Sequence, residues 1–468
     1  MILAGNFFLL GVSLLIMLWL ATQRLNPSRH YFFYILYLQF VVYLHIAPTF
    51  YLISVDNEYA KLYLYLQFAC ILLFEIPFIF FYLRSVKELN NGREGWNKII
   101  LNYNRIIILS AYSILFSILF LVFAIKQRIL FLSYGEEDMV VTLTSLPGYV
   151  WVIYRSFILS GIILAVLLLV ISYRATSRAM KEVSFFAFMV TFGTWLAWAM
   201  LNQRGSCIVG ILMIVGVMVY FGRVNILRPL TVFLAFMALI YTYNVVLNIR
   251  WGMSARHGLT YEMFSPFPKF RQYAEGGTRP ISLWWRLNGI ELMAMITPEA
   301  SRQGFAKGQA WAISGYVLLM QIISREAVEQ YKLDASAMGK TYLLWRYTNV
   351  REKDYCSCML TDPYGNFWVF GFLLVALVLG KACAYCVKNT LSPSSALSVV
   401  MASFILAQII RFEWEFFSMV VGSYRAIPGI LPFLILNPFK AVHPQKRPHR
   451  LLAAISRKEF PPAPAPGS

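Results

Sequence analysis

Long apolar runs separated by short polar segments dominate the chain. Eleven of these runs are long enough, or nearly so, to cross a bilayer, which takes about 20 apolar residues in a helix. The predicted spans are residues 2–21, 31–53, 62–83, 106–124, 149–172, 183–201, 207–221, 229–249, 364–387, 395–410 and 417–436. The pattern therefore predicts an all-α polytopic membrane protein with about eleven transmembrane helices.

The composition supports this prediction. Of 468 residues, 59 % are hydrophobic and 13 % are charged, whereas a soluble domain carries roughly a quarter charged residues. This excludes an ordinary water-soluble enzyme, a disordered protein and a disulfide-dense secreted domain. The 28 Tyr and 12 Trp residues fit a protein with many helix ends at the membrane interface.

The net charge of +19 follows from topology and needs no nucleic-acid partner. Nothing basic precedes the first apolar run and no cleavage site follows it, which predicts an uncleaved helix with its N-terminus outside. With that orientation, 20 of the 41 basic residues fall in the predicted inside loops and tail, and five fall in the short outside loops. The C-terminus is then inside, facing anionic lipid.

One outside segment, residues 250–363, is about a hundred residues long and too long for a passive connector. It divides the chain into spans one to eight (1–249), a long outer loop with short helices (250–363), spans nine to eleven (364–437) and a basic, Pro-rich inside tail (438–468). Within the loop, Ser282 is expected to cap a helix over Leu283 to Ile296. The apolar stretch from Ala310 to Ile323 is expected to be interfacial or re-entrant.

Motifs for soluble nucleotide-driven chemistry and for cofactors are missing from the sequence. It has no P-loop, no dinucleotide fingerprint and no nucleophile elbow. None of the five His residues is spaced for zinc, and Cys383 and Cys386 lie in a predicted span without a second ligand pair. We expect no cofactor and no metal. The alternative is a divalent ion on Asp56 and Glu58 in the first outside loop.

Arginines at the predicted outer face are the most informative anomaly. Three of them lie at helix ends: Arg204, Arg250 and Arg411. Arg256 and Arg286 lie in the long loop, and Arg155 and Arg425 lie inside apolar runs. An intramembrane charge is costly and usually faces a cavity or a partner. The guanidinium fork binds phosphate oxygens bidentately, so these residues are candidates for holding a diphosphate. The alternatives are snorkelling to lipid headgroups and, for Arg425, pairing with Glu75.

A general base is expected among the outer-loop residues. His257 is the one His in an outside loop, and its neighbour is Arg256. The candidate catalytic residues are His257, Glu291 and Arg286, the last to stabilise negative charge on a leaving group. Other carboxylates in outside segments are rival bases: Glu262, Asp362 and Glu413.

Four pieces of the region 190–440 resemble the bacterial Wzy-type polymerases of O-antigen and exopolysaccharide repeat units. Gln203-Arg204-Gly205-Ser206 opens a span, a large outside loop follows, and Arg286-Leu287 precedes an apolar helix. The fourth piece, Asp362 to Gly371, is similar to the family's Asn-Phe-Gly segment. It departs from that segment in one position, since Trp368 follows Phe367 where Gly is common.

The resemblance implies a GT-C-like membrane glycosyltransferase at the outer face of a bacterial inner membrane, with a periplasmic N-terminus and a cytoplasmic C-terminus. It would join polyprenyl-diphosphate-linked oligosaccharides, without a cofactor, alongside a chain-length regulator and a flippase. Three alternatives stay open. They are an O-antigen ligase, a metal-dependent GT-C enzyme that uses Asp56 and Glu58, and a transporter of the lipid-linked oligosaccharide. The single long loop disfavours the matched halves of a transporter.

Overall fold

The computed structural model describes residues 2–27, 29–54, 58–86, 99–126, 148–202, 204–221, 287–313, 339–348, 357–391, 396–409 and 426–441, with isolated residues between them. These residues are helical apart from turns and two short strands, β1 (Ile99–Leu101) and β2 (Phe439–Ala441), which pair antiparallel. The helices are α1 (Ile2–Gln23), α2 (Tyr31–Val41), η1 (Val42–Ile46), α3 (Ala47–Ser54), α4 (Ala60–Cys70), η2 (Ile71–Glu75), α5 (Ile76–Val86), α6 (Tyr103–Lys126), α8 (Gly148–Arg174), α9 (Arg178–Asn202), α10 (Arg204–Tyr220), α13 (Glu291–Gln303), α16 (Gly339–Tyr347), α17 (Thr361–Phe367), α18 (Phe370–Leu391), α19 (Ala396–Ile409) and α21 (Ile427–Leu436). The elements η1 and η2 are single π-helical turns.

The described helices confirm a polytopic all-α membrane protein. Seven of them are long and apolar enough to cross a membrane: Ile2–Gln23, Tyr31–Ile53, Ala60–Val86, Tyr103–Lys126, Ser156–Arg174, Arg178–Ala199 and Phe370–Thr390. Three shorter apolar helices cover Gly210–Val219, Ser398–Ile409 and Ile427–Leu436. The predicted eighth span, 229–249, lies outside the described residues except at two positions, so the total of eleven stays a prediction.

Burial separates lipid-facing helices from an interior helix. Large apolar side chains on several helices face outward, for example Phe8 and Ile435, each 70 % exposed. A bilayer is the solvent that accepts such a surface. In contrast, every side chain of α8 from Ser156 to Ser172 is buried, so α8 is surrounded by other helices, chiefly α9, α6, α21 and α19.

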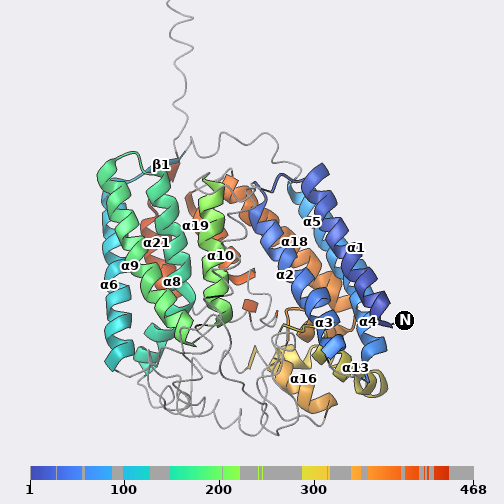
Figure 1. The fold of residues 1–468 in the computed structure, drawn as a ribbon. Coiled ribbons are helices and arrows are strands. Elements are labelled where there is room, and N and C mark those ends of the chain that lie inside the picture. The colour runs from blue at the N-terminus through green and yellow to red at the C-terminus, as the bar shows by residue number, and fades with distance from the viewer. Residues whose placement is uncertain are drawn as a thin grey trace, which may run out of the picture.

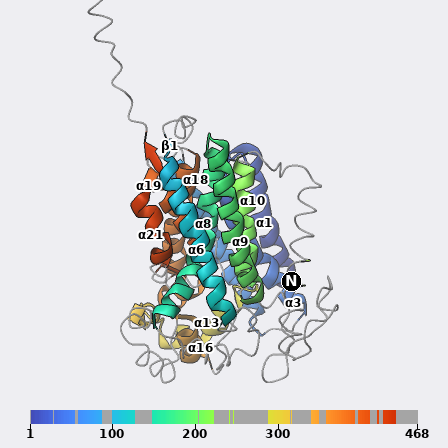
Figure 2. The same ribbon diagram turned by 90° about the vertical axis from the view of Figure 1, so that its left-hand side faces the viewer.

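The long helices run side by side, and the bundle has two distinct ends (Figure 1). We call the end where α13 and α16 lie the loop end, and the end where β1 and β2 pair the strand end. Figure 2, a quarter turn away, shows the same separation. The chain starts at the loop end with α1 and arrives at the strand end with β2 (Figure 1). The two ends of the described chain therefore lie at opposite ends of the bundle.

The two ends also differ in charge. Basic residues at the helix termini and turns of the strand end include Arg24, Arg29, Arg84, Arg105, Arg174, Arg178 and Lys388. Described acidic residues at the loop end are Glu58, Glu291, Glu299 and Asp362, among basic ones such as Lys61, Arg302 and Lys307. This distribution supports a strand end on the inside of the membrane.

We expect reporter fusions after Gly304 and after Phe439 to report opposite sides of the membrane. Gly304 follows α13 at the loop end, whereas Phe439 opens β2 at the strand end. Alkaline phosphatase, which is active outside, should work at Gly304, and a fluorescent protein that folds inside should work at Phe439. If both sites report the same side, the orientation derived from charge is wrong.

The ninth span begins later than predicted. The expected start at residue 364 falls inside the separate short helix α17, and α18 begins at Phe370. The two helices are separated at Trp368, whose φ of 58° is left-handed and cannot continue a right-handed helix. The Asp362 to Phe367 segment is therefore packed at the loop end and does not form the first turns of the span.

The first helix of the long loop is also placed differently. Residues 287–290 form turns, and α13 starts at Glu291 and continues past Pro298 to Gln303. The side chain of Asn288 accepts hydrogen bonds from the backbone N–H groups of Ile290 and Glu291, at 3.2 and 3.1 Å. These two bonds pair backbone N–H groups at the start of α13. Ser282 lies outside the described residues, so the cap expected there stays a prediction. The described part of the helix expected over Leu283 to Ile296 therefore begins at Glu291.

Candidate functional site

Three of the nine sequence-predicted site residues lie in described helices, and all three helices begin at the loop end. Arg204 is the first residue of α10, Glu291 is the first residue of α13, and Arg155 lies in α8, about two turns after its start at Gly148. The other six lie outside the described residues: Arg250, Arg256, His257, Arg286, Arg411 and Arg425. Convergence of the arginines on one cavity thus stays a prediction.

Glu291 is anchored to the transmembrane bundle. It is 2 % exposed, and its carboxylate accepts a hydrogen bond from the hydroxyl of Tyr63 on α4. The amide of Asn288 donates to the same hydroxyl at 2.7 Å. The backbone N–H of Gly289 donates to the carbonyl of Tyr43 in η1 at 3.0 Å. These contacts fix the start of α13 against two membrane helices.

Asp362 forms a second anchor at the loop end. It is 1 % exposed. Its carboxylate accepts the indole N–H of Trp311 at 2.8 Å and the backbone N–H of Phe416 at 3.0 Å. Asn366 continues the network, since its amide donates to the Asp362 carbonyl at 2.7 Å and its side-chain oxygen accepts from the Ala310 backbone at 3.2 Å. Three distant chain segments are joined through one carboxylate.

Two glycines of this segment are required by close packing. A Cβ added at Gly365 would lie 2.4 Å from a methyl of Leu343 on α16, and one added at Gly371 would lie 2.3 Å from the carbonyl oxygen of Pro363. The second contact is with backbone and cannot be relieved by a side-chain rotation. The segment that resembles the family pattern is thus a tight packing centre between α16, α17 and α18.

Cys358 packs at the junction of the two anchors. Its thiol is buried and donates to the carbonyl of Gly289 at 3.5 Å. Burial raises the pKa of the Cys358 thiol to about 12, and hydrogen bonds from the backbone of Leu360 and from Thr361 oppose this rise. Because the thiolate is the reactive form, this residue should be inert in the folded protein.

We expect Cys358 to react with a maleimide at least about a hundredfold more slowly than an exposed cysteine, because its thiolate is scarce and covered. The matched control is Arg302→Cys on α13, at a side chain that is 77 % exposed. Labelling is followed by peptide mass mapping before and after denaturation. Equal rates at the two positions in the folded protein would contradict the packing of α13 on α17.

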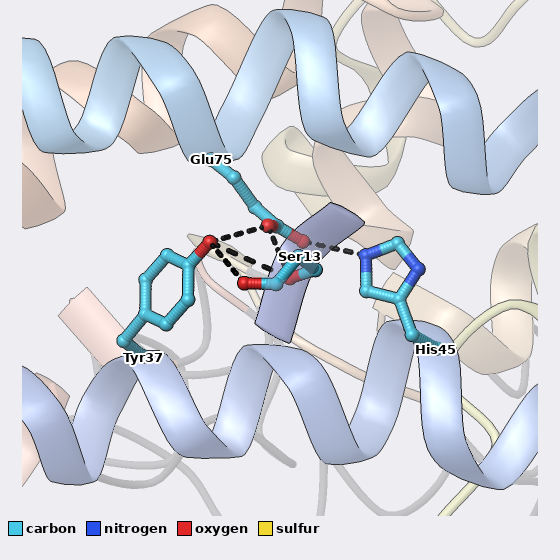
Figure 3. A network of polar contacts seen from close by, with 4 residues as sticks. All are labelled: Ser13, Tyr37, His45 and Glu75. Atoms are coloured by element: carbon cyan, nitrogen blue, oxygen red, sulfur yellow. Dashed lines mark hydrogen bonds and ion pairs between the residues drawn. The ribbon is translucent and has the colours of Figure 1, made fainter. Parts of the chain in front are cut away.

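A buried polar network lies farther inside the bundle (Figure 3). Glu75 of η2 accepts from the imidazole Nε2 of His45 at 2.6 Å, from the hydroxyl of Ser13 at 2.7 Å and from Tyr37 at 2.8 Å. All four side chains are fully buried. They come from α1, α2 and the two π-helical turns η1 and η2, and π-helical turns are frequent at functional sites.

The sequence suggests Glu75 only as an alternative partner for Arg425. Among the described residues, its carboxylate oxygens bond with His45, Ser13 and Tyr37. Arg425 lies outside the described residues, so its pairing with Glu75 stays a prediction. The signal that could have found the pair is that Glu75 is the one acid in its apolar run and His45 the one histidine in another. The two residues are in contact because their spans pack together, and the spacing of residues along the sequence does not predict which spans pack together.

Neither Cys383 nor Cys386 has a metal-ligand environment in the described structure. Both are free thiols buried in α18, and Cys386 donates to the carbonyl of Ala402 on α19 at 3.3 Å. Among the described residues, no group of three or more His, Cys, Asp or Glu side chains is placed to hold a metal ion. Asp56 lies outside the described residues.

The anchored loop end and the interior network are the two sites that the described residues form. Comparison with known proteins gave no match to the chain from a family model, a curated protein or a solved structure.

Proposed function

We propose that the protein is a GT-C-like membrane glycosyltransferase with eleven spans that polymerises polyprenyl-diphosphate-linked oligosaccharide repeat units. It would act at the outer face of a bacterial inner membrane. The observation that carries the proposal is the anchored loop end, where Glu291 and Asp362 fix α13 and α17 onto the bundle. The arginine-bearing helices α8 and α10 begin at the same end.

In the proposed reaction the acceptor hydroxyl attacks the anomeric carbon of the donor and polyprenyl diphosphate leaves, with inversion. Arginine guanidinium groups at the loop end neutralise the charge that develops on the diphosphate. His257 takes the proton from the acceptor hydroxyl. A carboxylate that is buried and already hydrogen-bonded is better placed to hold a loop than to contact a sugar substrate. We therefore assign Glu291 and Asp362 positioning roles, which is narrower than the catalytic role first expected for Glu291.

A transporter of lipid-linked oligosaccharide is the second candidate, and one observation favours it. The pair Glu75 and His45 is ionisable and lies inside the membrane-spanning part of the bundle. Intramembrane ionisable pairs are typical of proton and ion pathways. We favour the polymerase because the anchored loop and the arginine-bearing helix starts are concentrated at one end.

The glycan profile of host cells that lack the protein separates these candidates. For a polymerase, single repeat units should replace the long surface polymer, and the intact gene should restore the polymer. A ligase predicts long polymer that accumulates on its lipid carrier, and a transporter predicts repeat units trapped on the cytoplasmic side. Either of the last two results would overturn the proposal.

A further inference from the structure

Three buried polar side chains, one each on α1, α3 and α4, lie on the loop-end side of Glu75, and we call Asn6, Thr49 and Gln67 the polar row. Each is fully buried. The side-chain oxygen of Asn6, the hydroxyl of Thr49 and both amide atoms of Gln67 have no hydrogen-bond partner within the described structure. Buried polar atoms are expensive to leave unpaired.

Two packing contacts bring α1 close to α3 and to α4 beside the polar row. The rings of Phe7 on α1 and Phe50 on α3 meet edge to face, with their centroids 6.4 Å apart. A Cβ added at Gly5 would lie 2.9 Å from a methyl of Leu64 on α4. Asn6 adjoins both contacts on α1, Thr49 adjoins the first on α3, and Gln67 lies about one turn after the second on α4.

The polar row leads toward the interior network. Thr49 follows His45 by one helical turn, and Asn6 and Ser13, two turns apart, are both on the buried face of α1. The second ring nitrogen of His45, Nδ1, has no partner among the described residues and faces away from Glu75 (Figure 3). On the loop side, Gln67 follows Tyr63 by one turn, and Tyr63 bonds with Glu291.

The strand-end side of Glu75 is closed by aromatic rings. Phe74 and Phe78 both pack against Phe40, with centroids 4.7 and 5.0 Å apart from it. Phe33 stacks on Phe78 at 5.5 Å, and all four rings are fully buried. Polar groups therefore continue from Glu75 toward the loop end, whereas stacked rings lie on the other side.

We propose that the polar row holds water and carries protons from the loop end to Glu75 and His45, which form a protonation site within the membrane. The row offers donors and acceptors from three helices, which is what a buried water needs. Hydronium in the solvent gives up a proton, which forms an O–H bond on Glu75, and water is left behind. Neutral Glu75 then donates a hydrogen bond from an oxygen that accepted one in the carboxylate form. The hydrogen bonds with His45, Ser13 and Tyr37 rearrange in response.

The titratable surroundings of Glu75 are sparse. Among the described residues, α2 contributes Tyr37, η1 contributes His45 and α4 contributes Cys70, whereas α1 contributes the uncharged Ser13. On α18, Cys383 and Cys386 lie near Tyr82 of α5, farther toward the strand end. The proton is thus shared chiefly between one carboxylate and one imidazole.

Infrared difference spectra of the full-length protein in lipid nanodiscs test the site directly. A protonated-carboxyl band should appear when the pH of the medium is lowered and disappear when the pH is raised again. Glu75→Gln should remove this band, and His45→Gln should move its titration midpoint. Glu182→Gln, at an exposed acid on α9, should leave it intact. Absence of the band in the parent, or its persistence in Glu75→Gln, would overturn the proposal.

The route is tested by replacing the polar row. In proteoliposomes, a pH step on the loop-end side should change the carboxyl band promptly. The double variant Gln67→Leu and Asn6→Leu should slow this response by about tenfold, because it removes polar sites that hold water. The matched control is Gln408→Leu, at another buried glutamine with an unpartnered amide nitrogen, on α19. A proton route from the loop end would be contradicted by any of three results. They are an equal response of the band to pH steps on either side, an unchanged rate in the double variant, and a response of the band to Na⁺ at constant pH.

Discussion

Replacing Glu75 with alanine is expected to destabilise the folded protein by about 3–5 kcal/mol, because each buried polar group that is left without its hydrogen-bond partner costs about 1–3 kcal/mol. The carboxylate serves His45, Ser13 and Tyr37 together, so its loss leaves three buried polar groups without their acceptor. The melting temperature of the purified protein in detergent should fall by roughly 5–10 °C. Because Glu75→Gln keeps the shape and one acceptor oxygen, it should be milder.

The matched control for this variant is Glu182→Ala on α9. Glu182 pairs with Arg178 on an exposed helix face, and exposed pairs contribute little to stability. We expect no measurable change in melting temperature. If Glu75→Ala melts like this control, the interior network does not stabilise the bundle, and its arrangement in Figure 3 is wrong.

Replacing Arg204 with lysine is expected to reduce polymer formation by about ten- to a hundredfold, because a lost charge-assisted contact at a dry site costs about 1.5–3 kcal/mol. Lysine keeps the charge but loses the planar fork that binds two phosphate oxygens. The same result is expected for Arg286→Lys and Arg411→Lys if these side chains share the diphosphate. Polymer is measured on gels at equal amounts of membrane protein.

Arg302→Lys is the matched control at the same end of the bundle. Arg302 is 77 % exposed and bonds locally with Glu299, so its replacement should leave polymer formation unchanged. A headgroup anchor also tolerates lysine. If all three test variants polymerise like the parent, the arginines are anchors and the assignment of a diphosphate site is wrong.

The membrane architecture could be predicted because it depends on long apolar runs. The candidate span Tyr31–Ile53 matches the predicted span 31–53, and the helix that covers the predicted span 62–83 runs from Ala60 to Val86. Runs of this kind have no alternative in a bilayer except a helix. The charge pattern along the loops likewise anticipated the basic strand end.

Local starts and breaks were harder to predict. The sequence Asp362 to Trp368 is polar and aromatic in a pattern that fits the first turns of a span. In the structure Trp368 reverses its φ so that Asp362 and Asn366 bond with the loop residues Trp311 and Ala310. A tertiary contact decides this conformation, and the spacing of apolar residues along the sequence does not predict such contacts.

The site was predicted only in part for the same reason. The sequence indicated Glu291 as a candidate functional carboxylate. It did not indicate the hydrogen-bond partner Tyr63, which is 228 residues away along the chain. The pair of Glu75 and His45 joins two different spans. Composition indicates that a buried charge needs a partner, and only the packing of the helices shows which residue fulfils that need.

The most direct measurement is an in vitro reaction of the purified protein in proteoliposomes with polyprenyl-diphosphate-linked repeat unit from its own host. We expect a ladder of products that grow by one repeat unit at a time, with release of polyprenyl diphosphate and no loss of activity in a chelator. A folded protein that leaves the repeat unit unjoined, or that only moves it across the bilayer, would contradict the account.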